Sequence, residues 1–337
     1  MKKRLLIPLA VLLLLSSCGG AGGRGAVKEA SCPRHFPTVS VPTVYTAPEE
    51  ISSYCAAHWW DDYFASSGPT DSLEILGVYK KEVEQAVANY ISLLELCPLQ
   101  KAQEEVGHMF SRLESRQGQE EEGSLFFLRF SSLVADLLYD PNSPMRSEDL
   151  FLPFVRGLAA SVWTRDDMRP GYEYQARMCA INQAGQKVPD IEYSDSHGRR
   201  GTLYGVKADL TLLFFSNPGC KACGEIMEQL ISVPEFNVMV SEGTLAVVSM
   251  YIDRELDKWR QWVPNYPEGW TVAYDRKFVI RDSQNYDVRA IPSLYLLDAD
   301  KRVVLKDAPV QKVLREIEIK YIQSHGNNQE KTLGQDR

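Results

Sequence analysis

The sequence predicts an all-α domain followed by an α/β domain, and its 337 residues are enough for about two domains. Between residues 51 and 181, apolar side chains recur at spacings of three and four, which is the period of helices packed on one side. From residue 188 onward, continuous apolar runs alternate with helical stretches, as in a sheet built from βαβ units. Hydrophobic residues at 44% and charged residues at 24% are typical of a globular chain, which excludes a disordered or multi-spanning protein.

The N-terminus is predicted to be an export signal. Three cationic residues precede an apolar run over residues 5–15, and these eleven residues are too few for a bilayer that needs about 20. Leu15-Ser16-Ser17-Cys18 resembles the lipobox of bacterial lipoproteins, which implies that Cys18 is lipidated. We therefore expect a signal peptide over residues 1–17 and a lipid that holds the protein to a membrane without spanning it. An ordinary signal peptide with a chance cysteine is the alternative.

The residues after the signal and the net charge indicate where the protein lies and what it does not bind. The residues after Cys18 are not acidic, which by resemblance to lipoprotein sorting implies a cell-envelope location facing the periplasm, at the outer membrane. Lys and Arg number 37 against 45 Asp and Glu, a net charge of −8 that falls to −11 when the three N-terminal cations are removed. A nucleic-acid binder normally shows a basic excess or stripe, so we expect no nucleic-acid partner.

The first part of the mature chain is predicted to be a linker and a helical domain. Residues 18–50 are expected to be the lipidated cysteine and a flexible linker, because glycines and then prolines dominate them. Residues 51–187 are expected to be the helical domain. Its five apolar stripes lie at residues 83–94, 102–113, 124–138, 151–162 and 174–181. Cys97-Pro98 ends the first stripe, and a turn with two prolines follows the third.

The second part is predicted to be the α/β domain, over residues 188–322, with a polar tail at 323–337. The expected strands lie at residues 190–193, 211–215, 245–252, 293–297 and 302–305. The expected helices lie at residues 220–232 and 310–322. The strand at 211–215 is apolar throughout, which indicates burial on both faces of a sheet.

The expected export means that the cysteines of the mature chain can form disulfides. Seven cysteines without Cys18 leave six, and disulfides persist outside the cytosol. Two of the six, Cys220 and Cys223, form a C-x-x-C pair. The others allow three pairings or none, and the sequence does not choose among them. These others are Cys32, Cys55, Cys97 and Cys179.

The C-x-x-C pair follows a buried strand and opens a helix. A thiol at a helix N-terminus is close to the positive end of the helix dipole and to free N–H groups, which favours the thiolate. We therefore expect Cys220 to be the exposed nucleophile and Cys223 the shielded resolving thiol. A zinc site, which would need two further ligands, and a purely structural disulfide are alternatives. A peroxidatic cysteine is disfavoured, because Asn217 and Leu213 stand where it has Thr or Ser and Pro.

A Pro-Gly-Cys-x-x-Cys motif ending at Cys223, together with the V-R-A-I-P-S-L run of residues 288–294, resembles the thioredoxin fold of the TlpA/redoxin kind. The resemblance implies a thioredoxin-like α/β domain in which Pro292 is a cis-proline facing the cysteines and Ile291 offers its backbone to an extended substrate. It implies a protein thiol–disulfide oxidoreductase without a cofactor. Its partners would be a disulfide-containing or dithiol protein substrate and a membrane or periplasmic thiol electron donor.

Two segments of the helical part also resemble a known domain. Residues 57–64, with the sequence A-H-W-W-D-D-Y-F, are similar to the opening of an uncharacterised helical domain. That domain precedes thioredoxin modules in lipoproteins from one lineage of Gram-negative bacteria, and residues 139–146 resemble its second signature. This resemblance implies an architecture and not an activity.

The sequence departs from the family at the acids that usually serve the resolving thiol. Phe214 stands where thioredoxin has a buried Asp, and Ile226 stands where TlpA-like members often have Glu. Glu225 and Glu228 are therefore the candidates for a proton relay to Cys223 through water. The departures also leave an alternative function: a binding or scaffold lipoprotein whose helical domain is the functional part, with a structural or redox-sensing thioredoxin module. Reductant, oxidant and isomerase roles all stay open.

Overall fold

The computed structural model describes residues 33–120 and 124–334. The predicted signal peptide, Cys18 and Cys32 lie outside these residues, so their lipidation and pairing stay predictions.

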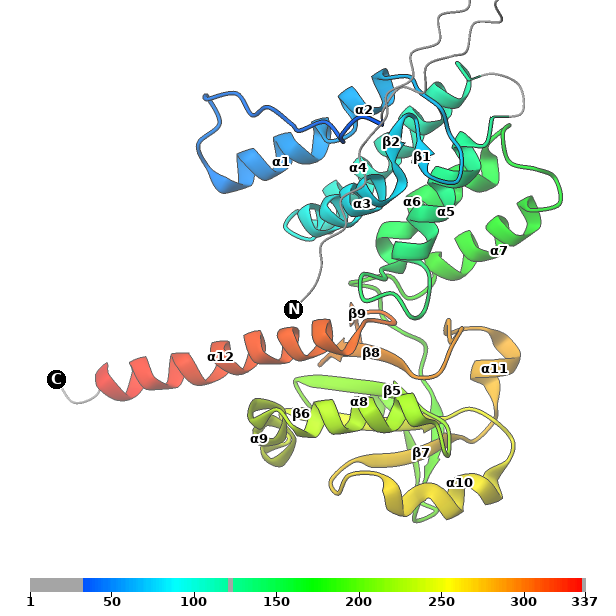
Figure 1. The fold of residues 1–337 in the computed structure, drawn as a ribbon. Helices are drawn as coiled ribbons and strands as arrows, with labels where there is room; N and C mark the ends of the chain where they lie inside the picture. Colours follow the sequence, from blue (N-terminus) through cyan, green and yellow to red (C-terminus); the bar gives the residue numbers. More distant parts are fainter. Residues whose placement is uncertain (1–32, 121–123, 335–337) are drawn as a thin grey trace, which may run out of the picture. The chain divides into compact units, whose positions relative to one another are not determined.

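Among the described residues, the elements between 48 and 180 are helices, apart from one short hairpin (Figure 1). Its elements are α1 (Pro48–His58), α2 (Asp61–Ala65), β1 (Glu74–Ile75), β2 (Val78–Tyr79), α3 (Lys80–Leu94), α4 (Leu99–Gln117), α5 (Phe126–Leu138), α6 (Glu148–Ala160) and α7 (Arg169–Ala180). The five predicted helices correspond to α3 to α7, and the all-α character of this part is confirmed.

One hydrophobic cluster fills the helical part. The apolar stripe predicted for α3 is the face of that helix turned into the cluster, with Val83, Tyr90 and Leu94 all buried. The Trp60 ring meets the Tyr90 ring edge to face at a centroid distance of 5.4 Å, and it meets Phe130 in the same way at 5.3 Å. Such aromatic pairs add to the free energy of area burial, so this cluster holds the helices together without the sheet.

The rest of the chain forms a seven-stranded mixed sheet in the order β4-β3-β7-β6-β5-β8-β9. The strands are β3 (Glu192–Asp195), β4 (Arg200–Thr202), β5 (Leu210–Phe215), β6 (Leu245–Tyr251), β7 (Thr271–Asp275), β8 (Ser293–Asp298) and β9 (Val303–Leu305). β5, β6 and β7 are parallel, and β8 runs antiparallel to β5. A helical region followed by a mixed α/β sheet confirms the predicted fold class.

Each face of this sheet has its own hydrophobic cluster. Leu212 and Phe214 of β5 belong to the cluster that includes the helices on one face, whereas Leu213 and Phe215 belong to the cluster on the other. The helices that contribute to the first cluster are α8 (Lys221–Ile231), α9 (Pro234–Glu242), α10 (Leu256–Trp262) and α12 (Val310–Gly334) (Figure 1). The short helix α11 (Val279–Ser283) contributes Ile280 to the second. The short turns are η1 (Leu203–Gly205) and η2 (Val263–Asn265). Burial of β5 on both faces agrees with its apolar sequence.

The C-terminal boundary differs from the prediction. The closing helix was expected to end at Ile322, but α12 continues to Gly334, so the predicted polar tail begins as helix. The segment contains no proline to stop a helix, and Ser324 Oγ donates to the Tyr321 carbonyl at 3.0 Å within it.

Other elements were not expected from the sequence. The β1–β2 hairpin turns at Leu76 and Gly77, whose φ angles are +53° and +68°. Two positive φ angles define a type I′ turn, for which Asn-Gly is the usual sequence signal. Here leucine stands in the first of these two positions, so the sequence did not indicate a turn. β4, β7, α9, α10 and α11 were also missed.

In the described part of the chain, no helix has the length and apolar character that crossing a membrane requires.

Candidate functional site

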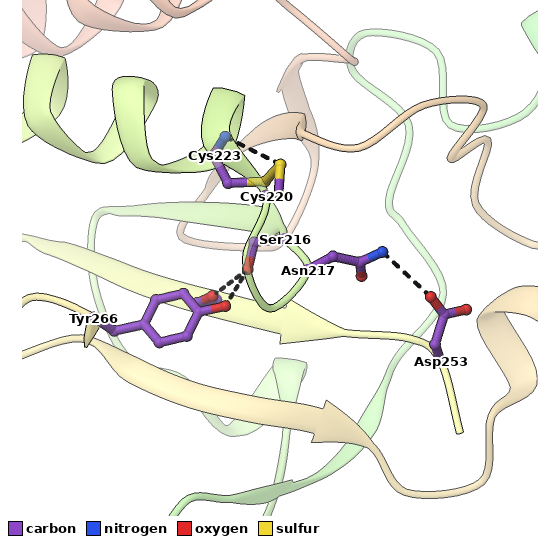
Figure 2. Close-up of a disulfide and its surroundings, with 7 residues drawn as sticks. Ser216, Asn217, Cys220, Cys223, Asp253 and Tyr266 are labelled. Carbon is purple, nitrogen blue, oxygen red and sulfur yellow. Dashed lines mark hydrogen bonds between the residues drawn. A yellow bond between two sulfur atoms is a disulfide. The ribbon is translucent and has the colours of Figure 1, made fainter. Parts of the chain in front are cut away.

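The cysteine pair lies where β5 passes into α8 (Figure 2). Gly219 turns the chain with a φ of +71°, and Cys220 is the N-cap of α8, its Sγ accepting a hydrogen bond from the Cys223 N–H at 3.1 Å. The two cysteines form a disulfide with their Cα atoms 5.2 Å apart. Cys220 is half-buried and Cys223 is 2% exposed. One sulfur can therefore be reached from solvent and the other is shielded, which is the arrangement that exchange through a mixed disulfide requires.

A buried hydroxyl network lies beneath the turn. Ser216, the first residue after β5, places its Oγ 2.8 Å from Ser249 Oγ and 2.9 Å from Tyr266 Oη (Figure 2). All three residues are buried, so these bonds fix the end of β5 against β6 and the segment after α10. Nothing in the sequence distinguishes Ser216 from any other loop serine, and sequence reasoning missed it.

The next residue, Asn217, points away from this network. Its Nδ2 donates to Asp253 Oδ2 at 3.3 Å (Figure 2), and Asp253 also pairs with Arg281 of α11. The turn before Cys220 is therefore tied to the ends of both β6 and α11.

The Ile291-Pro292 segment lies at the same edge of the sheet as the cysteines. The register of β5 and β8 pairs Phe215 with Ser293, so the residues after the first strand and before the second are neighbours. The peptide bond between Ile291 and Pro292 is cis. Ile291 and Cys220 both pack against the cluster on the helical face of the sheet.

The two candidate relay acids do not point to the buried sulfur. Glu225 and Glu228 are exposed on α8, and Glu225 Oε1 lies 3.2 Å from Lys221 Nζ. Cys223 instead shares its cluster with Phe214, so its surroundings are apolar. A relay through water from either glutamate stays a prediction.

A groove with a volume of about 580 Å³ lies beside the cis-proline segment. It is lined by Asn217, by residues 286–291, by the ends of β6 and α11, and by Tyr174 and Met178 of α7. Neither cysteine lines the groove, but Asn217 and Ile291 do. The helical part therefore contributes to a surface near the cysteine pair, which sequence reasoning did not foresee.

A cluster of charged side chains adjoins this groove, and we call it the seam cluster. Its members are Arg146, Glu148, Asp287, Arg289, Lys306 and Asp307. Arg289 Nη2 lies 3.1 Å from both Glu148 Oε1 and Asp307 Oδ2, and Lys306 Nζ lies 2.6 Å from Glu148 Oε2. The Arg289 guanidinium also lies over the Tyr139 ring, 3.8 Å from its centroid. Three anions thus meet three cations, as buried charges require.

Burial shifts the titration of the carboxyl groups in this cluster. It raises the pKa of Glu148 to about 7, against attraction from Lys306. Burial also raises the pKa values of Asp287 and Asp307.

Three further cysteines are described, and the structure joins none of Cys55, Cys97 and Cys179 in a disulfide. Burial raises the pKa values of Cys97 and Cys179, so their thiols resist ionisation. Cys220 and Cys223 are therefore the redox-active candidates among the described cysteines.

A mixed sheet that presents a C-x-x-C pair at a strand–helix junction, beside an X-Pro segment, defines a thioredoxin-like protein. Comparison with known families and structures agrees. Residues 208–303 match the family described as thioredoxin-like, and residues 17–179 match a domain of unknown function, DUF5106. No curated protein matches the chain.

Three solved structures illustrate the similarity. A thioredoxin-like protein from Bacteroides caccae is 34% identical with a TM-score of 0.71, over 85% of this chain and 99% of that one. The C-terminal domain of an uncharacterized protein from Bacteroides fragilis is 44% identical with a TM-score of 0.40, over 41% of this chain and 98% of that one. The thioredoxin domain of a thiol-disulfide oxidoreductase from Bacteroides vulgatus is 20% identical with a TM-score of 0.36, over 40% and 98%.

The chain belongs to the thioredoxin-like family, with an N-terminal DUF5106 domain. The resemblances to the thioredoxin fold and to an uncharacterised helical domain are thereby confirmed.

Proposed function

We propose that this protein is a protein thiol–disulfide oxidoreductase with Cys220 as nucleophile and Cys223 as resolving thiol. The observation that carries the proposal is the disulfide at the start of α8, with one sulfur accessible and one buried. The Ile291-Pro292 segment supports it, because the register of β5 and β8 places this segment at the same edge of the sheet as the cysteines.

The chemistry balances as two successive exchanges. The Cys220 thiolate attacks one sulfur of a substrate disulfide, forms a mixed disulfide and releases the other substrate sulfur as a thiolate. The Cys223 thiolate then attacks Cys220 Sγ, which restores the protein disulfide and releases the second substrate thiolate. Two electrons pass from the protein to the substrate, and a thiol electron donor returns them. The reverse sequence oxidises a dithiol substrate.

We place this reaction at the cell envelope, on a protein held by a lipid on Cys18. Support for the location comes from the cationic head, the short apolar run and the lipobox resemblance of residues 1–18. The electron donor would then be a membrane or periplasmic thiol protein.

The test is a glutathione redox titration of the chain starting after Cys18, with thiols counted by mass-tagged alkylation. We expect one reversible two-electron transition that Cys220→Ser abolishes. Cys55→Ser is the matched control, since Cys55 is a free, half-buried thiol outside the site, and it should leave the transition in place. A strongly negative potential would indicate a reductant, and a high potential an oxidant or isomerase.

A second candidate function has one observation in its favour. Cys223 is packed beside Phe214 with both nearby glutamates exposed, so the resolving thiol has no buried acid among the described residues to take its proton. A scaffold lipoprotein with a structural or redox-sensing thioredoxin module would fit this arrangement. Absence of any transition across the accessible glutathione range would reject the oxidoreductase and support the scaffold.

A further inference from the structure

We propose that α7 of the helical part forms the second side of the substrate site, with Tyr174 and Met178 contacting the polypeptide segment bound along Ile291. This inference rests on the proposed function and deepens it. It specifies the substrate as a polypeptide disulfide whose flanking residues enter the groove, as opposed to a small-molecule disulfide.

The groove connects α7 to the cysteine pair through residues already placed. Asn217, three residues before Cys220, lines the groove at one point, and Ile291, which packs in the same cluster as Cys220, lines it at another. A substrate whose cysteine reaches Cys220 therefore extends its neighbouring residues along Ile291 and into the groove. Its volume of about 580 Å³ is within the range of binding pockets, roughly 300–1,000 Å³.

The α7 side of the groove presents an exposed tyrosine, a residue type that proteins often use to bind one another. Tyr174 is 38% exposed, so its ring and hydroxyl can be reached from solvent, whereas Met178 is buried and lines the groove beside it. The Arg177 guanidinium lies 5.0 Å from the Tyr174 ring centroid and supports that ring from the same helix. Tyrosine offers a large contact area and a hydroxyl at low entropic cost, and is enriched where proteins recognise one another.

The two sides of the groove are fixed to each other by the seam cluster. Lys306 Nζ donates to the Met178 carbonyl at 2.8 Å and to the Ile181 carbonyl at 2.7 Å, at the C-terminal end of α7. Lys306 pairs with Glu148, and Glu148 pairs with Arg289, two residues before Ile291. A continuous chain of charge-assisted bonds thus runs from α7 to the substrate-binding segment, and such bonds are stronger than neutral ones.

The mechanistic consequence is a division of roles. Tyr174 contacts the substrate, whereas Glu148 acts through Arg289 and Lys306 and is a positioning residue. Loss of either should reduce reaction with an extended polypeptide more than reaction with a small disulfide that touches only the sulfur.

The experiment compares two chromogenic disulfides on the reduced full chain at pH 8. One is a ten-residue peptide whose single cysteine is linked to thionitrobenzoate, and the other is Ellman's reagent. Both release thionitrobenzoate when Cys220 attacks. The rate that Cys220→Ser retains comes from the other free thiols and is subtracted, so the ratio of the remaining rate constants measures recognition of the polypeptide. Tyr174→Ala should lower the peptide-to-Ellman ratio about tenfold, the effect of losing a central aromatic contact.

Matched controls separate recognition from stability. Tyr79→Ala removes a tyrosine that is 42% exposed on the helical part and does not line the groove, so the ratio should not change. Glu148→Gln should lower the ratio, whereas Glu105→Gln should not. Both glutamates have side chains 1% exposed and lie 2.6 Å from a lysine Nζ, but Glu105 pairs with Lys101 within α4, away from the groove.

The outcomes are distinct. An unchanged ratio in Tyr174→Ala would overturn the inference while leaving the oxidoreductase intact. A lower ratio in Tyr79→Ala or Glu105→Gln of the same size would also overturn it, because the effect would then be general destabilisation. If the wild-type chain releases thionitrobenzoate from both probes no faster than Cys220→Ser does, the proposed function itself fails, and the inference fails with it.

Discussion

At the scale of single residues, the candidate site is surrounded by contacts between residues distant in the sequence, such as Ser216 with Ser249 and Lys306 with the Met178 carbonyl. Cys220, Cys223 and Pro292 belong to short motifs with fixed spacing, so the sequence alone indicated them. Ser216 and Lys306 have no such signal, because each acts through contacts with residues distant in the chain. Lys306 and the Met178 carbonyl that it binds are 128 positions apart, and no local pattern encodes that distance.

Glu148 leads to a prediction about pH. Burial raises its pKa to about 7 from an ordinary 4.5, so between these values the folded protein keeps a proton that the unfolded chain has released. This group's contribution to the free energy of unfolding therefore falls as pH rises through that window, by at most about 1.4 kcal/mol per pH unit. Urea unfolding of wild type and Glu148→Gln at pH 5, 6, 7 and 8 checks this. In the variant, the free energy of unfolding should fall less steeply with pH. If it changes with pH in the same way in both proteins, Glu148 is not the group responsible.

At the scale of elements, a strong apolar periodicity was enough to predict a helix or strand. The residues typical of turns were not enough to predict where every element begins and ends. The stripes of α3 to α7 and the apolar runs of β5 and β6 lie close to where the sequence put them. β7 was missed because its five residues follow Trp270 without the long apolar run that marked its neighbours. The predicted end of α12 was wrong, because a polar composition does not end a helix when no proline or capping residue is present.

The crossing of α4 and α6 gives a second prediction. A Cβ added at Gly157 of α6 would overlap the Phe110 ring of α4, whereas a Cβ at Gly107 of α4 would meet nothing within 4 Å. Gly157→Ala should therefore lower the free energy of unfolding by about 1–3 kcal/mol in spite of alanine's higher helix propensity. Gly107→Ala, the control, should raise it by about 0.5–1 kcal/mol. Chemical denaturation measures both, and equal effects would show that α6 is not packed as closely as described.

At the scale of the whole molecule, the described chain has separate hydrophobic clusters joined through charge. The cluster of the helical part contains no residue beyond Ala180, and the two clusters of the sheet begin at Val188. The seam cluster is one connection between them, because its ion pairs join Glu148 of α6 to Arg289 and Lys306. The sequence showed two parts with different periodicity, but a boundary in periodicity says nothing about what joins the parts.

Lys306 joins the two parts, because it pairs with Glu148 of α6 and donates to the Met178 carbonyl of α7. It gives a third prediction. Lys306→Met leaves Glu148 paired with Arg289 but without Lys306, and it leaves the α7 carbonyls without their donor, which should cost about 3–5 kcal/mol. Lys101→Met removes the partner of Glu105 in α4, but the Lys101 side chain is 41% exposed, so the cost should stay below about 1 kcal/mol. Hydrogen exchange should rise in both α7 and β8 only for the first variant. Equal losses in the two variants would mean that the seam cluster does not couple the parts.

The position of α12 has a consequence for the timing of assembly. Val313 and Ile317 of this last helix belong to the same cluster as Cys223, so the face of the sheet behind the resolving thiol is completed by the final described element of the chain. A polypeptide exported from its N-terminus delivers both site cysteines about 90 residues before that helix arrives. If the chain is exported as we propose, Cys223 would be an unshielded thiol in an oxidising compartment during that interval, open to pairing with any other cysteine of the nascent chain. Correct maturation would then require α12 to pack onto the sheet before the cysteines react elsewhere.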